Sequence, residues 1–197
     1  MKRLFCAVSI IVLAGAGCAS NASYGPQAAQ PANVPDAAEL LGDVEKMTPE
    51  QLAAAMEEDM HKNPPQYLTD DQMKQEESAA ASTMSGTKIS SGAFAAKAHR
   101  GAGGATVVRR DGSTYLVLDA AFATDAGPRL HVFLTGHPDP ANSADVHSAG
   151  DADLGPLKAT SGAQVYEIPA TAADGDWKSV VVYCVPFKVV FTSASLR

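Results

Sequence analysis

The chain has 197 residues and a formal net charge of −7. The charge is uneven, because residues 19–86 carry three lysines against twelve acidic residues, whereas residues 87–197 carry ten acidic and ten basic residues. A neutral segment behind an acidic one argues against nucleic-acid binding, which needs a basic face. It also argues against electrostatic attraction to anionic lipid.

Residues 1–17 have the layout of a bacterial export signal. Lys2 and Arg3 precede the apolar run "LFCAVSIIVLAGAG", which is too short to span a bilayer as a helix. The stretch "LAGAGC" resembles a lipobox, in which signal peptidase cleaves before the cysteine and the cysteine is then acylated. Cys18 is therefore predicted to carry a lipid anchor with acyl chains such as palmitate, and Ala19 favours the outer membrane over the inner membrane.

The lipobox is imperfect, because Gly15 stands where leucine is usual. The alternative is cleavage after the "AGA" of residues 14–16, which would release a soluble, secreted or periplasmic protein that begins at Gly17. The two outcomes differ in their thiols. An acylated Cys18 leaves Cys184 without a partner for an internal disulfide, which is unusual in an oxidising compartment, whereas in the soluble form the two cysteines could pair.

Residues 18–47 are rich in Ala, Pro, Asn and Gln, and this composition predicts a disordered tether. Residues 48–86 predict an acidic helical segment with two helices. Each helix is expected to begin at a threonine N-cap with a glutamine three residues later, as Thr48 and Gln51 and then as Thr69 and Gln72. Such helices are marginal alone and need a partner surface.

Met56, Met60 and His61 lie close together on the first of these helices. Thioether and imidazole groups bind copper, so one interpretation is a copper-handling strip. The alternative is an amphipathic helix that uses methionine for packing, with Leu52, Met56 and Met60 as a narrow apolar stripe.

From residue 87 the pattern changes from helix to strand. Asp111-Gly112, between "GATVVRR" and "STYLVLDAAF", predicts a tight hairpin. Further strands are predicted in "PRLHVFLTG", "AQVYEIPA" and "WKSVVVYCVPFKVVFTSASL", and no later segment shows a helical period. Residues 87–197 therefore predict an all-β domain, an antiparallel β-sandwich or partly closed barrel, preceded by a short helical, partly disordered N-terminal arm.

Cys184 lies in the strand-like stretch "SVVVYCVPFKVV", residues 179–190. Alternation places Val181 and Tyr183 on the deep core face and Cys184 on the second face. Pro186 interrupts the ladder, so the thiol is expected near an edge defect, where it can be reached under an overlying loop. The alternative is a buried, inert cysteine that fills the core.

A reactive thiol needs a neighbouring histidine or other cation that lowers its pKa. His99, before a glycine-rich turn, and His131, within a predicted strand, are the candidates to approach Cys184. A cysteine with two histidines is the minimum for a blue-copper-like site, and one axial thiolate is sufficient for haem, so both cofactors stay open. The alternative for each histidine is a polar residue on a sheet face.

Residues 136–153, "GHPDPANSADVHSAGDAD", are predicted to form a long solvated loop. The potential ligands in it are His137, His147, Asp139, Asp145, Asp151 and Asp153. Their spacing matches no defined calcium or zinc loop, so no metal site is predicted there. The chain also lacks an HExxH motif, a CxxC motif and a nucleophile elbow, and "GAGG" at 101–104 is not followed by a helix. A hydrolase or transferase is therefore not indicated.

Residues 87–197 as a set resemble the DM13 domain. The resemblance rests on "SGAF" with the following His99, and on "GSTYLVLDAAF", "AGPRLHVFLTG", "LGPLKATSGAQVYEIP" and "SVVVYCVPFKVVFTSASL". It implies an all-β domain for which electron transfer has been proposed, with the cysteine as a bare thiol or as ligand to a prosthetic group such as haem. Cys184 matches that cysteine and His99 matches an early histidine, whereas Tyr183 stands where tryptophan is common.

The function predicted from these features is a redox or electron-transfer role through Cys184 in an envelope-anchored lipoprotein. No redox module is fused to the domain in this sequence, so electron transfer would need a separate envelope redox protein as partner. The alternative is a non-enzymatic binding or structural lipoprotein in which Cys184 only fills the core.

Overall fold

The computed structural model describes residues 44–197. The predicted signal, the lipidation at Cys18 and nearly all of the predicted tether lie outside the described residues. Among residues 44–197, no helix has both the length and the apolar character that crossing a bilayer requires.

The described chain begins with a short 3-10 helix, η1 (Val44–Lys46), and two α-helices, α2 (Pro49–Lys62) and α3 (Asp70–Thr83). Both α-helices begin at the predicted threonine caps. In each, the threonine side chain accepts from the glutamine backbone N–H while the glutamine side chain accepts from the threonine backbone N–H, which satisfies two donors that a helix start leaves unpaired. The capping prediction is confirmed.

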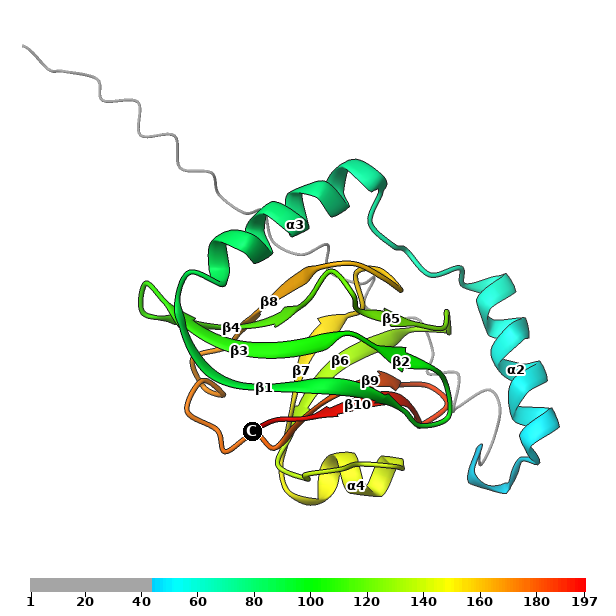
Figure 1. Cartoon of the computed structure of the whole chain (residues 1–197). Helices are drawn as coiled ribbons and strands as arrows, with labels where there is room; N and C mark the ends of the chain where they lie inside the picture. The colour runs from blue at the N-terminus through cyan, green and yellow to red at the C-terminus, as the bar shows by residue number, and fades with distance from the viewer. Residues whose placement is uncertain (1–43) are drawn as a thin grey trace, which may run out of the picture. The chain divides into compact units, whose positions relative to one another are not determined.

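Helix α3 is anchored on strand β8 (Gln164–Ile168) (Figure 1). The Glu76 carboxylate accepts hydrogen bonds from Lys158 Nζ and from the backbone N–H of Val165, each at 2.9 Å. The Glu76 side chain is only 13 % exposed, so these charge-assisted bonds are poorly screened by water. Helix α3 thereby shields β8, which lies at the edge of the sheet.

Eight strands form one antiparallel sheet in the order β7-β6-β9-β10-β1-β3-β4-β8. Its other strands are β1 Thr87–Ala96, β3 Gly104–Arg110, β4 Ser113–Leu118, β6 Leu130–Thr135, β7 Asp151–Pro156, β9 Ser179–Cys184 and β10 Val189–Ser195. A separate two-stranded sheet pairs β2 Gly101–Ala102 with β5 Ala123–Thr124. The β3–β4 hairpin turns at Asp111 and Gly112 with φ values of 50° and 86°, as the sequence predicts.

The sheet curls until its two edge strands approach each other. The Tyr166 hydroxyl of β8 donates to Gln164 Oε1 at 2.8 Å and lies 3.5 Å from the carbonyl oxygen of Pro156 in β7. The Tyr166 hydroxyl also accepts from the backbone N–H of Lys158, at 3.1 Å. The all-β prediction is confirmed in its form as a partly closed barrel (Figure 1).

The barrel interior holds the main core, with Leu116, Val132 and Phe191 among its fully buried members. A smaller apolar cluster lies on the other face of β6 and β9 and includes Phe133, Val146 and other residues of those strands. Val146 comes from a short helix, α4 (Ser143–Ser148), which covers this outer face. The strands β6 and β9 are therefore buried on both faces.

Two expectations for the chain after residue 87 are wrong, namely that residues 136–153 form a loop and that no helical segment follows. Residues 136–153 are not wholly a loop, because α4 and the start of β7 lie within them. Helix α4 has six residues and one buried apolar side chain, which is too little to produce a helical period in the sequence. Strand β7 consists of "DADLGP", a polar edge segment whose burial pattern gives no clear alternation.

Candidate functional site

Cys184 is the last residue of β9, immediately before the four-residue turn to β10. Its Cα pairs with Leu130 of β6 and with Val189 of β10. The side chain is 0 % exposed, and the thiol donates a hydrogen bond to the carbonyl oxygen of Pro128 at 3.0 Å. Cys184 is the free cysteine of the described residues.

The predicted face of Cys184 is wrong. Val182 and Cys184 point into the main core, whereas Val181 and Tyr183 belong to the outer cluster under α4. The strand does end before Pro186, as expected, but the thiol beneath that break is buried and not reachable. All six residues of β9 are buried, so the apolar pattern alone could not distinguish the two faces.

The loop Ala126–Arg129, ahead of β6, forms one wall of the site. A Cβ on Gly127 would lie 2.4 Å from Cζ of Phe191, so only glycine fits against that ring without a shift. The next residue, Pro128, supplies the carbonyl that accepts from Cys184. Arg129 has a φ of 44°, in the left-handed region that non-glycine residues seldom adopt. This wall is thus held in a defined and locally strained conformation.

Helix α2 forms a second wall through Met56 and Asp59, its two buried residues. Met56 packs into the same core cluster as Cys184, with Leu52 partly buried beside it. Asp59 Oδ2 lies 3.7 Å from Arg129 Nε, an ion pair whose geometry is not that of a hydrogen bond. The side chains of Asp59 and Arg129 are 10 % and 24 % exposed, so both charges are largely removed from water.

Three buried side-chain polar atoms of the described residues have no hydrogen-bond partner, and all three belong to this junction. They are Asp59 Oδ2, Arg129 Nε and the hydroxyl of Tyr67. Tyr67 follows α2, and the backbone of Gly127 lies near its hydroxyl without hydrogen-bond geometry. Burial raises the pKa of Tyr67. Each unsatisfied buried group costs roughly 1–3 kcal/mol, so polar groups concentrated in this way are energetically unfavourable.

Burial is the dominant influence on the thiol, and it raises the pKa of Cys184 from an ordinary 9.0 to about 12. The backbone N–H of Phe187 and the Arg129 guanidinium act in the opposite direction, whereas the Asp59 carboxylate raises the pKa further. Arg129 and Asp59 thus act on the thiol in opposite directions while α2 is in place. At neutral pH the thiol is protonated and is a poor nucleophile.

Neither histidine singled out in the sequence is bonded to Cys184. The His99 ring stacks on Phe191 with a centroid distance of 3.8 Å, and His99 Nδ1 lies 3.5 Å from Asp125. His131 Nδ1 lies 2.8 Å from Asp153, and its Cα pairs with Tyr183, which places it on the outer face. Across the described residues, no hydrogen bond or ion pair joins either imidazole to the sulfur.

The donor set around Cys184 does not fit haem or copper in this arrangement. The sulfur is protonated and already donates to a carbonyl. Haem iron and copper each need a deprotonated thiolate that is free to bind the metal. Within residues 44–197, no group of three or more His, Cys, Asp or Glu side chains could hold a metal ion. In the possible copper strip, Met56 packs into the core, and exposed His61 bonds to the carbonyl of Glu57.

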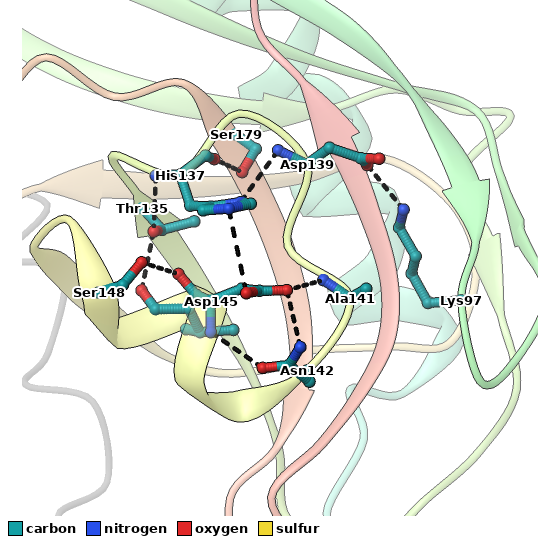
Figure 2. A network of polar contacts seen from close by, with 10 residues as sticks. Lys97, Thr135, His137, Asp139, Ala141, Asn142, Asp145, Ser148 and Ser179 are labelled. Carbon is teal, nitrogen blue, oxygen red and sulfur yellow. Dashed lines mark hydrogen bonds and ion pairs between the residues drawn. The ribbon is translucent and has the colours of Figure 1, made fainter.

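The segment 136–150 is ordered by polar contacts centred on His137 and Asp145 (Figure 2). His137 Nδ1 accepts from the backbone N–H of Asp139, so a neutral ring carries its proton on Nε2, 4.0 Å from Asp145 Oδ1. The backbone N–H of Ala141 is the main cause of the lowered pKa of Asp145. Lys97, after β1, holds Asp139 at 2.6 Å. These contacts position α4 and give His137, Asp139 and Asp145 a structural role.

Two cavities lie elsewhere on the barrel. One, of about 330 Å³, is lined by small residues of β1 and β10 together with Asp139 and Arg197. The other, of about 380 Å³, lies at the β3–β4 hairpin and is lined in part by Arg109 and Asp174. Neither is lined by Cys184 or by the two histidines predicted to approach it.

Sequence reasoning missed Asp59, Tyr67 and Arg129. A signal for Asp59 is present, because it continues the apolar stripe of Leu52 and Met56 at the spacing of one helix face. An acidic residue on a buried face requires a partner, and that requirement could have pointed to a buried cation. Nothing in the sequence identifies Arg129 as that cation, because seventy positions separate the two residues.

The β domain matches the model of a known protein family. Residues 93–196, more than half of the chain, match the family model described as electron transfer DM13. No curated protein and no solved structure matches the chain. The matched range contains the cysteine-bearing strand β9, the Ala126–Arg129 wall and all barrel strands except the start of β1, and it excludes α2 and α3. The chain therefore belongs to the DM13 family, which is described as a family of electron-transfer domains.

Proposed function

We propose that this protein is an envelope-anchored electron carrier that works through the sulfur of Cys184. The observation that carries the proposal is the largely buried ion pair of Arg129 and Asp59, both of which act electrostatically on the thiol. A cysteine that only fills a core needs no such pair, because burying charges costs several kcal/mol per ion before their attraction offsets it. A cation beside a sulfur is what thiol chemistry requires.

The redox step that a bare thiol can perform is exchange with a disulfide of a partner protein. The Cys184 thiolate would attack one partner sulfur, forming one S–S bond while the partner's S–S bond breaks. The partner's second sulfur leaves as a thiolate, and the proton lost from Cys184 passes to solvent. In the mixed disulfide the Cys184 sulfur is oxidised and only one partner sulfur is reduced. A dithiol of a second partner would complete the two-electron transfer: its first thiolate attacks the Cys184 sulfur and releases the first partner as a dithiol, and its second thiolate then closes the second partner's own disulfide and releases the Cys184 thiolate.

The proposed location is the bacterial envelope. Acylation of Cys18 would attach the chain to a membrane, with the outer membrane favoured by Ala19, and the acidic segment would separate the barrel from the lipid. A redox protein of the same compartment is the proposed partner. Cleavage at residues 14–16 would instead give a soluble protein in the periplasm or outside the cell.

The test uses the full-length protein purified from its native envelope, compared with Cys184→Ser and Cys184→Ala. The purified protein is incubated with disulfide-containing redox buffers of graded potential, and the mixed disulfide is quantified by intact mass. We expect a reversible adduct at Cys184 and loss of the envelope redox phenotype in both variants. A folded Cys184→Ala protein with an unchanged phenotype would exclude the proposed electron-carrier role.

A second candidate function is supported by the complete burial of the sulfur. In that case the protein is a non-enzymatic binding or structural lipoprotein, and Cys184 stabilises the core through its packing and its bond to Pro128. This role predicts that Cys184→Ser lowers stability, because a hydroxyl replaces a small apolar group, and that the cellular phenotype survives.

A further inference from the structure

Helix α2 closes the site from outside the matched family domain. Its buried side chains, Met56 and Asp59, lie one turn apart, and the rest of the helix is exposed or only partly buried. Met56 adds an apolar contact to the core that contains Cys184, and Asp59 pairs with Arg129. The family match begins at residue 93, so the barrel and its cysteine form a unit to which α2 is an addition.

The contact between α2 and the barrel is weak in its polar part. The Asp59–Arg129 pair is long at 3.7 Å, and each partner keeps a buried atom without a hydrogen bond. Asp59 Oδ1 bonds only within its own helix region, to Asn63 at 2.9 Å. Water could satisfy these atoms if α2 moved away, and this gain would offset part of the lost burial of Met56.

The next helix is held independently. Glu76 ties α3 to β8 through Lys158 and Val165, so α3 can stay on the barrel when α2 leaves it. The connection between the helices contains Pro64 and Pro65 and has no regular secondary structure. It also makes a separate contact near its end, where the Leu68 N–H donates to the Lys158 carbonyl at 2.9 Å. A hinge between Asn63 and Leu68 would therefore move α2 together with the preceding η1, whose Val44 is buried in the same core cluster, while α3 stays on the barrel.

We propose that α2 is a displaceable cover over Cys184, and that Arg129, which Asp59 neutralises while the cover is seated, is the positioning residue that faces the sulfur once the cover has moved. This inference rests on the proposed function of Cys184 and assigns its regulation. In the covered state the thiol is protected from oxidation in the envelope. In the open state a partner can reach the sulfur, with a cation beside it.

The charges that face the sulfur change in a defined way when the cover opens. Arg129 and the backbone N–H of Phe187 stay with the barrel, and Asp59 leaves with α2. Tyr183 is a further titratable neighbour, adjacent in β9 and pointing to the other face. Tyr67, near Gly127, and Lys188, in the turn after Cys184, are the other titratable groups around the site. Opening therefore removes the anion that disfavours the thiolate and lessens its burial, and it retains the groups that favour it.

The test is native-state alkylation of Cys184 with iodoacetamide in the full chain, followed by mass spectrometry across urea concentrations below the unfolding transition. Opening of the cover alone exposes little surface, so the labelling rate should depend only weakly on urea. Met56→Ala should raise the rate about tenfold or more, because the packing that seats α2 is lost. Met73→Ala, which trims a methionine on α3, is the matched control and should change the rate by less than about twofold.

The role of Arg129 is tested by the pH profile of the same reaction in the Met56→Ala background. Adding Arg129→Gln should move the rise in labelling rate to higher pH, and Arg129→Lys should restore the original profile, because the positive charge is retained. A purely structural role for Arg129 would change the rate at all pH values without moving the profile. That result would overturn the assignment of Arg129.

The cover is overturned if labelling follows global unfolding, with the same urea dependence as the unfolding transition and no separate effect of Met56→Ala. This readout requires no electron transfer, so it can fail while the proposed function stands. Conversely, a cover confirmed by labelling together with an unchanged phenotype of Cys184→Ala would reject the electron-carrier role and leave the gating result intact.

Discussion

The thiol of Cys184 donates a hydrogen bond to the carbonyl oxygen of Pro128, 3.0 Å away, and both groups are enclosed at the end of β9. This bond exists only in the protonated form of the thiol, and burial raises the pKa of Cys184 to about 12. The unfolded chain loses the same proton near its ordinary pKa of 9.0. The folded state therefore binds more protons than the unfolded state between these two values.

Stability should accordingly fall with rising pH from about pH 9, by at most about 1.4 kcal/mol per pH unit from this thiol. Below pH 9 its contribution is fully present. Urea unfolding of the wild type and of Cys184→Ala between pH 8 and pH 11 measures it, because subtraction removes the tyrosines that titrate in the same range. A difference between the two proteins that stays constant with pH would contradict the raised pKa.

Gly127→Ala should loosen the wall of the site. The added Cβ would lie 2.4 Å from the buried ring of Phe191, which itself stacks on His99, so the loop has to move. We expect a loss of about 2 kcal/mol and faster alkylation of Cys184. Gly112→Ala is the control, because its Cβ meets no atom within 4 Å and only its φ of 86° is unfavourable. That variant should lose about 1 kcal/mol and leave alkylation unchanged.

Glu76→Ala should detach α3. The substitution leaves the Val165 N–H without its acceptor and removes the carboxylate partner of the Lys158 ammonium, which keeps the Val165 carbonyl, so we expect a loss of about 2–3 kcal/mol in urea unfolding. The neighbouring Glu77 is exposed, and Glu77→Ala should change stability by less than about 0.5 kcal/mol. Equal effects of the two substitutions would show that α3 is not anchored through Glu76.

The attachment of α4 can be measured through one hydrogen bond. The hydroxyls of Ser143 and Tyr183 lie 2.7 Å apart, and burial raises the pKa of Tyr183. Ser143→Ala and Tyr183→Phe should each cost about 1 kcal/mol, and the double variant should cost less than their sum by a similar amount. Strict additivity in the double-mutant cycle would mean that the two hydroxyls do not interact in solution.

Processing at Cys18 predicts the thiol content of the mature protein. The acylated form should show one titratable thiol after denaturation, from Cys184, and an intact mass that includes the lipid. Cys184→Ser should then show none, and Cys18→Ser should lose the lipid mass. A mature chain that begins at Gly17, with two titratable cysteines after reduction, would establish the soluble alternative.

The features that could be predicted from the sequence are those set by neighbouring residues. Thr48 with Gln51 and Thr69 with Gln72 satisfy their own backbone groups, and Asp111-Gly112 supplies the positive φ values that a tight hairpin needs. Each of these signals acts within four positions. The same locality made the β character of the domain visible, because strand and turn composition is also a short-range property.

The orientation of Cys184 and the charges around it could not be predicted, for two physical reasons. A strand buried on both faces shows no polar side, so Val182 and Tyr183 look equivalent until α4 is known to cover one of them. The pairing of Asp59 with Arg129 depends on how a helix docks on a barrel, a long-range arrangement that no local pattern specifies. Cys184 lies within the matched family range, and in the proposed cover mechanism its reactivity is set by that docking.

Strand β10 has a consequence for how the chain is assembled. It is the link between the group β7-β6-β9 and the group β1-β3-β4-β8 in the sheet order, and it follows every other strand in the sequence. During synthesis or export, the strand edges that pair with β10 therefore stay unpaired until nearly the whole domain has emerged. Such late, long-range pairing slows folding and leaves strand edges exposed to aggregation until β10 is in place.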